Sequence, residues 1–221
     1  MKRIIIICEG QTEIEFCKKT LSPYFISKNI YIQGTLIKKS QGGIVKWESI
    51  KNQILNHLKS DKNVFVTTFI DYYGLYASYN FPNWEDSHKM ADKNSIIESL
   101  EDAMKIDLGS DFSVRFIPYI QLHEFEGLLF NDIKIFYDNI PKSDLVGITE
   151  LEDTFAKYNN PEMINNSKEN APSKRLTRII KGYNKIVYGN ILAEEIGLTN
   201  IRNKSPRFNN WINIIESILL T

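Results

Sequence analysis

Several features that would mark a particular class of protein are scarce or missing in this chain of 221 residues. It has only two cysteines, Cys8 and Cys17. Two thiols make neither a disulfide framework nor a four-ligand zinc site, so we expect both to be reduced and structural. No apolar run approaches the ~20 residues of a membrane span, and the opening run is too short for a signal peptide. We therefore expect a cytoplasmic protein with no membrane partner.

An excess of one charge is also missing, since 27 basic and 27 acidic residues give a net charge of zero. This balance argues against nucleic-acid binding by overall attraction alone. The charges are unevenly spread, with an acidic excess over 82–162 and a basic excess over 168–207. Such asymmetry permits a basic groove near an acidic site, and it equally permits two solvated faces.

Two enzyme motifs are incomplete. The Gly-Lys-Ser/Thr of a phosphate-binding loop does not follow Gly42-Gly43, so any ATPase would be a separate subunit. His123-Glu124 begins the zinc-protease motif HExxH, but Gly127 stands where the second His is needed. The role of His123 stays open between an orienting or proton-shuttling partner of a site and a helix cap.

The chain does contain an alternation of strand-like and helix-like stretches. Residues 3–8 (RIIIIC) are apolar throughout, as in a strand buried on both faces. Strand patterns recur over 30–37, 63–70 and 114–120, and helical patterns separate them. Strands that alternate with helices predict an α/β fold whose central sheet is mainly parallel and flanked by helices.

The second part of the chain has a different pattern. Residues 159–173 are the most loop-like stretch, and the pattern from Lys174 onward is helical. We therefore expect an α/β catalytic core over 1–137. A mostly helical C-terminal extension over 138–221 is expected to pack on this core.

The turn after the first strand has its own signals. Gly10 supplies the turn, and Thr12 is a candidate N-cap, with Glu15 three residues later to complete a capping box. We expect the first helix to start there.

Carboxylates follow three of the predicted strands. Glu9 and Glu13 come after the first, Asp71 after the third, and Glu124 and Glu126 after the fourth. The carboxyl ends of parallel strands meet at one edge of the sheet, where ligands bind. Oxygen ligands suit Mg²⁺ or Mn²⁺, and two such ions assist phosphodiester cleavage. A lone acid after a strand is more often a cap or a surface residue, but three such clusters favour a metal site.

Two further groups of residues fit contact with nucleic acid. Lys174, Arg178, Lys181 and Lys185 share one helical face if a helix runs unbroken through Gly182. Such a face is suited to contacting a phosphate backbone. It is also typical of a solvated helix surface without a ligand. The aromatic residues between positions 72 and 84 are suited to base stacking or to packing of a lid.

The stretches CEGQTE at 8–13 and FIDYYG at 69–74 resemble the Toprim catalytic pattern of topoisomerases, primases and OLD-family nucleases. The resemblance implies a Toprim-like fold in which Glu9 holds metal or acts as a general base. Glu13 is similar to the second acid of the OLD-type variant. The usual Asp-x-Asp is Asp71-Tyr72-Tyr73 here, so its second acid is missing. We expect Glu124 or Glu126 to supply that ligand.

The whole chain resembles a bacterial family, domain of unknown function family 4276, through CEGQTEIEF, FIDYYGL, FIPYIQLHEFEGLLF, NPEMIN, APSKRL and RFNNWI. That family is Toprim-like and often encoded beside ABC-type ATPases in phage-defence loci. The resemblance implies a metal-dependent nuclease acting on DNA or RNA in defence against phages or mobile elements, with an ABC-type ATPase as partner.

The same resemblance assigns further roles. Through APSKRL it implies that Lys174 and Arg175 neutralise the scissile phosphate, and Lys185 is the second choice beside them. The sequence leaves open whether the protein forms a homodimer. The alternative function is a non-catalytic, degenerate Toprim subunit that docks on the ATPase.

Overall fold

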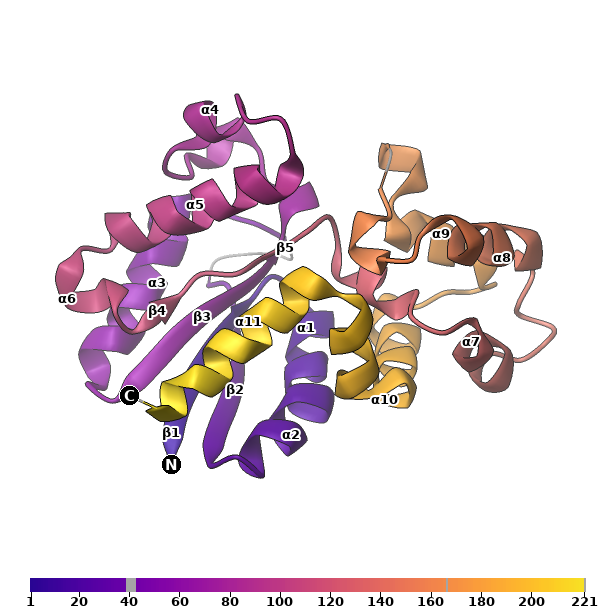
Figure 1. Cartoon of the computed structure of the whole chain (residues 1–221), viewed down its shortest axis with the longest axis horizontal. Coiled ribbons are helices and arrows are strands. Elements are labelled where there is room, and N and C mark those ends of the chain that lie inside the picture. Colours follow the sequence, from indigo (N-terminus) through magenta and orange to yellow (C-terminus); the bar gives the residue numbers. More distant parts are fainter. Residues whose placement is uncertain (39–42, 166, 221) are drawn as a thin grey trace. The chain divides into compact units, whose positions relative to one another are not determined.

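The computed structural model describes residues 1–38, 43–165 and 167–220, which form two compact units (Figure 1). Unit 1 comprises Met1–Leu122 and Trp211–Thr221, and unit 2 comprises His123–Asn210. This division differs from the boundary expected after residue 137, because the chain enters unit 2 earlier and returns to unit 1 near its end. Gly42, predicted to lie in a loop, falls outside the described residues.

Unit 1 is built on a parallel sheet. Its strands are β1 (Lys2–Cys8), β2 (Ile30–Leu36), β3 (Val64–Asp71), β4 (Phe116–Ile117) and β5 (Ile120–Gln121). Their order is β2-β1-β3-β4, β5 pairs with the end of β3, and every pair is parallel. The isoleucines of β1 are buried, as a central strand covered on both faces requires. The strand predicted over 114–120 is instead two short strands around Pro118, which has no N–H to donate to a ladder.

Helices connect these strands and cover the sheet. They are α1 (Gln11–Phe16), the π-helix η1 (Cys17–Leu21), α2 (Ser22–Ile26), α3 (Trp47–Ser60), η2 (Tyr72–Gly74), η3 (Ala77–Tyr79), α4 (Trp84–Ser87), α5 (Lys93–Asp107) and α6 (Ser110–Ser113). The apolar stripes of α3 and α5 form one buried cluster with side chains of β1 and β3. The spacing of Ile50, Ile54 and Leu58 places one side of α3 in this cluster.

From Trp211 onward, the last helix packs against the sheet of unit 1. It is α11 (Pro206–Ser217), followed by η7 (Ile218–Leu220). The Trp211 Nε1–H donates to Thr67 Oγ1 at 2.9 Å, and its ring stacks on Tyr119 with centroids 4.4 Å apart. Figure 1 shows this helix crossing a face of the sheet. The prediction of a parallel α/β sheet flanked by helices is confirmed.

The two cysteines lie in this core. Cys8 and Cys17 are free and buried, with their sulfur atoms 3.8 Å apart. Burial, and then the hydrogen bond with Cys17, raises the pKa of the Cys8 thiol well above its ordinary value. A thiol in such surroundings stays protonated and is a poor nucleophile.

Unit 2 is mostly helical, as predicted for the C-terminal region. Its elements are η4 (Phe125–Leu129), α7 (Ile133–Asn139), α8 (Ile148–Lys157), η5 (Pro161–Met163), η6 (Lys168–Asn170), α9 (Pro172–Ile179), α10 (Lys185–Lys204) and the start of α11. The buried Glu162 accepts the N–H groups of Arg207 (2.9 Å) and Phe208 (3.0 Å). This carboxylate satisfies backbone donors at the start of α11.

None of the helices in the described ranges is long and apolar enough to cross a membrane.

Candidate functional site

The ends of β1 and β3 bring Glu9 and Asp71 together. Glu9 directly follows β1, Asp71 is the last residue of β3, and the two strands are parallel neighbours. The Glu9 N–H donates to Phe69 O at 3.2 Å, which continues the ladder beyond β1. The Asp71 N–H donates to Glu9 Oε2 at 3.0 Å. The backbone of β3 therefore holds the Glu9 carboxylate beside Asp71.

Gly74, in η2, lies close to the same carboxylate. A Cβ atom at this position would lie 3.4 Å from Glu9 Oε1 and 3.8 Å from Glu9 Oε2. A Cβ atom at this position would make ordinary van der Waals contact with the carboxylate, so Gly74 lines the space beside Glu9. The sequence signal for this residue was a glycine three positions after Asp71, which our predictions had not used.

Glu13 lies in the first turn of α1 and is buried. Its Oε2 accepts the Gly10 N–H at 2.9 Å, so Glu13 caps the helix whose N-cap is Gly10. The predicted cap of Thr12 with Glu15 is therefore wrong, because the helix begins earlier, at Gln11. Glu13 therefore has a structural role as the cap of α1, and this role is separate from the one predicted for it in a metal site.

The aromatic residues that follow β3 fall into two groups. Phe81 is buried and contacts Trp47, with ring centroids 5.6 Å apart. Tyr72 is half-buried and its hydroxyl is hydrogen-bonded to His88 Nε2 at 3.1 Å, whereas the Tyr76 ring is exposed. Core packing therefore accounts for part of the cluster, and Tyr76 remains accessible for stacking.

In unit 2, Glu126 lies in a polar cluster and is fully buried. Lys185 Nζ lies 3.1 Å from Glu126 Oε1. This contact is an ion pair without the alignment of a hydrogen bond, and neither Glu126 oxygen accepts a hydrogen bond from the described residues. A buried carboxylate with such sparse compensation costs stability. The retention of a buried charged group with so few partners points to function rather than to stability of the fold.

Glu124 belongs to the same cluster. Its Oε2 accepts the Ser173 N–H at 2.9 Å, in the first turn of α9. Burial raises the pKa of the Glu124 carboxyl above its ordinary value, and the Glu126 charge adds to this, while the Ser173 hydrogen bonds oppose it. Glu124 therefore keeps its proton to a higher pH than an exposed glutamate does.

Tyr183 completes the cluster and was not predicted. Its hydroxyl is buried and has no hydrogen-bond partner among the described residues. Burial, and then the charge of Glu126, raises the pKa of Tyr183, so it remains a neutral O–H group. Its sequence signal is weak, namely a tyrosine two positions before Lys185.

His123 has an unusual backbone conformation. Its φ angle is +68°, in the left-handed region that strains a residue with a side chain. It is also buried. Strain of this kind is usually stored where the placement of a side chain matters for function.

The predicted basic face does not form. α9 ends at Ile179, Gly182 follows with a φ angle of +71°, and α10 begins only at Lys185. Lys174 and Lys185 therefore lie on different helices, and the unbroken helix on which a continuous basic face depended is not present. The helix ends because Ile180 adopts an extended conformation and forms a β-bridge with Leu145, and Gly182 then adopts a left-handed conformation that strains other residues.

Lys174 and Arg175 differ in their surroundings. Lys174 is exposed. The Arg175 guanidinium donates to Thr154 Oγ1 at 3.1 Å and to Asn170 O at 3.0 Å. It also forms an ion pair with Glu150 at 3.5 Å. Arg175 thus ties α9 to α8, and Lys174 is the one of the two whose side chain faces solvent.

A comparison with protein families places the chain. The sequence model of a family described as a domain of unknown function (DUF4276) matches residues 8–216. The chain belongs to this family. The matched span holds every site residue discussed above, from Glu9 to Lys185. No curated protein and no solved structure matches this family member.

Proposed function

We propose that this protein is a Mg²⁺- or Mn²⁺-dependent phosphodiesterase that cleaves DNA or RNA. The observation that carries the proposal is the hydrogen bond from the Asp71 N–H to Glu9 Oε2. It holds the Glu9 carboxylate against the backbone of Asp71 at the carboxyl ends of adjacent parallel strands, the edge at which α/β proteins bind ligands.

The donor set fits a hard divalent ion. Among the residues that the structure describes, no group of three or more His, Cys, Asp or Glu side chains is arranged to hold a metal. Mg²⁺ does not require such a cage, since it is commonly held by one or two carboxylates, water and substrate phosphate. Glu9 and Asp71 would be the protein ligands, and the ion would stabilise negative charge on the phosphate oxygens.

The chain's own groups prepare this arrangement. The β3 backbone fixes the orientation of Glu9, and Gly74 lies beside its carboxylate. The contact of Glu13 with Gly10 fixes the turn that follows Glu9. Preorganised ligands of this kind lose little entropy when an ion or a phosphate binds.

Unit 2 has predicted site residues of its own. The exposed Lys174 is suited to a phosphate backbone. The prediction that Glu124 or Glu126 supplies a further ligand, and the roles predicted for His123 and Lys185, are tested by the same assay as Glu9. The resemblance to the Toprim pattern and to OLD-type nucleases supports the reaction class, and a defence role beside an ABC-type ATPase follows from it as part of the proposal.

The test measures cleavage of DNA and RNA with Mg²⁺, with Mn²⁺ and with EDTA. The variants Glu9→Gln and Asp71→Asn keep the size of the side chain and remove its charge. We expect each to lower the rate about 100-fold or more, because loss of residues that merely support metal ligands already costs 10–100-fold. Thermal unfolding of each variant in EDTA separates a lost ligand from a lost fold.

Glu98→Gln and Asp138→Asn are matched controls, since both residues are exposed and lie outside the site. They are expected to cleave like the wild type. The proposal fails if Glu9→Gln and Asp71→Asn also cleave like the wild type.

The second candidate function is a non-catalytic docking subunit for an ATPase. Tyr73, which stands in place of the second Asp of the Asp-x-Asp pattern, favours it. Calorimetric titration with Mn²⁺ distinguishes the two. No binding at millimolar metal, together with no cleavage of any nucleic acid, would favour the docking subunit.

A further inference from the structure

Unit 1 contains a cavity that the proposed function does not use. It lies at the amino ends of β1, β3 and β4, where Lys2, Asn63 and Phe116 are found, whereas Glu9 and Asp71 lie at the carboxyl ends of the strands. Its volume is about 760 Å³. That is within the range of pockets that hold small organic ligands, roughly 300–1,000 Å³.

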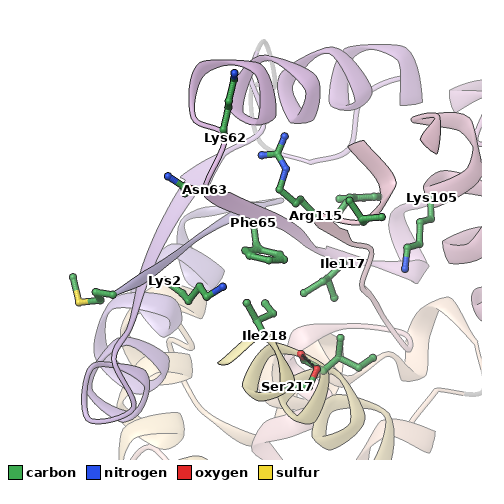
Figure 2. Close-up of a pocket in the computed structure, with 13 residues that line it drawn as sticks. Lys2, Lys62, Asn63, Phe65, Lys105, Arg115, Ile117, Ser217 and Ile218 are labelled. Carbon is green, nitrogen blue, oxygen red and sulfur yellow. Dashed lines mark hydrogen bonds between the residues drawn. The ribbon is translucent and has the colours of Figure 1, made fainter. Parts of the chain in front are cut away.

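The lining of this cavity is partly apolar. Figure 2 shows Phe65, Ile117 and Ile218 grouped on its floor. Val114 and Ile214 also line it and remain 73% and 42% exposed. Large aliphatic side chains that stay exposed around a hollow give an apolar ligand area to cover.

Four cationic side chains, and no acidic one, are among the described residues that line the cavity: Lys2, Lys62, Lys105 and Arg115. None of the four forms an ion pair with a carboxylate of the described residues. In Figure 2, Lys2 and Lys105 lie on opposite sides of the apolar floor, and Lys62 points away from it.

Two of these cations are held by the protein. The Arg115 guanidinium donates to the carbonyl groups of Leu58, Asp61 and Val64, at 3.0–3.1 Å, so its position is fixed while its charge is not neutralised by a carboxylate. Lys2 Nζ lies 5.8 Å from the centre of the Phe65 ring. A cation is thereby kept directly beside an aromatic surface.

We propose that this cavity binds a small aromatic phosphate of mononucleotide size. The flat body of such a ligand would cover Phe65 and the aliphatic floor, and its doubly charged phosphate would meet Lys2, while Lys105 on the opposite side (Figure 2) would attract the same charge from a longer distance. Cations without a carboxylate partner, placed beside apolar surface, suit a ligand that carries both a negative charge and an apolar ring. The inference does not depend on the metal site, since it involves the other end of the sheet.

The test is calorimetric titration of the full chain with adenosine 5′-monophosphate in EDTA. The chelator removes any contribution from a metal site. Adenosine alone and inorganic phosphate alone are expected to bind at least about tenfold more weakly, because each offers only one of the two kinds of contact. Equal affinity for inorganic phosphate would show a simple anion site and would overturn the proposal.

The variant Lys2→Glu/Lys105→Glu is expected to lower the affinity at least about tenfold. Lys18→Glu/Lys134→Glu changes the net charge equally at exposed positions outside the cavity, and it should bind like the wild type. Val114→Asn removes apolar contact at an exposed position without disturbing the core, and should weaken binding of the nucleotide but not of phosphate.

Three further results would contradict the proposal. They are no binding by the wild type at millimolar nucleotide, equal loss in both double variants, and loss of binding in Glu9→Gln. The last would place the ligand at the metal site instead.

Discussion

Glu9 and Glu13 of unit 1 and Glu126 of unit 2 are held by different kinds of partner. Glu9 and Glu13 each accept a backbone N–H, from Asp71 and Gly10. Glu126 has no hydrogen bond from the described residues and depends on the charge of Lys185. A neutral backbone donor is set by the fold itself, whereas a lysine can be removed by one substitution.

This difference in partners predicts how the stability of the fold responds to mutation of each acid. Removing an acid from unit 1 leaves a backbone donor without its partner, so the fold loses stability. Removing Glu126 relieves a buried charge, so the fold gains stability. Stability gained on removing a residue is typical of a group kept for function.

The largest expected effect is at Lys185. Lys185→Met leaves Glu126 buried without its cation, and we expect a loss of about 3 kcal/mol in the free energy of unfolding. Glu126→Gln is the matched variant. Because the Lys185 side chain is 44% exposed and stays hydrated when its partner is lost, this variant should be about 1 kcal/mol more stable than the wild type.

Urea unfolding followed by far-UV circular dichroism measures both variants. Equal losses in the two would mean that the pair stabilises the fold in the ordinary way, and the contrast between the two units would then disappear.

A smaller effect is expected at Glu13. Glu13→Ala removes the cap at Gly10 and should cost about 1–2 kcal/mol, because the Gly10 N–H then lacks the oxygen that accepts it. Glu13→Gln keeps an acceptor and should lose less than half as much. The same urea titration measures the two. If the alanine variant were as stable as the wild type, the capping contact would have no energetic weight.

The smallest effect is the pH dependence at Glu124. Its pKa is raised in the folded state, so its contribution to stability is fully present below the ordinary value of about 4.5. It is lost as the pH rises through the folded pKa, because the unfolded chain releases the proton first. Glu124→Gln keeps an acceptor for Ser173 and cannot titrate.

Melting temperatures of Glu124→Gln and wild type, measured from pH 4 to 8, test this sign. The variant should gain on the wild type as the pH rises. A constant difference across that range would show that Glu124 titrates at its ordinary pKa.

Much of the fold was open to prediction from the sequence. The apolar run of β1 predicted a central strand, and parallel strands predicted that Glu9 and Asp71 would meet at one edge. Both arguments use local patterns that fix direction and burial. Pro118 carried the signal that divides the fourth strand in two, since it lacks an N–H, but the apolar pattern around it concealed the break.

The rest depended on contacts between distant segments. Nothing near Tyr183 in the sequence indicates that it shares a cluster with Glu126, because a buried polar group has no periodic pattern. Whether a helix continues through Gly182 was left open for a related reason: glycine is tolerated inside some helices and follows the end of others, according to the packing around it. The cap at Gly10 was missed because serine and threonine are the commoner signals.

The return of the chain to unit 1 at Trp211 has a consequence for biosynthesis. This indole closes over Thr67 and Tyr119, so the first unit is a discontinuous domain whose last piece is translated after the whole of unit 2. At the usual 5–20 residues per second, the ribosome needs roughly 4–18 seconds to add the intervening stretch. During that interval the face of the sheet around Phe69 lacks its cover, so apolar surface of the nascent chain stays exposed to solvent until Trp211 has been added.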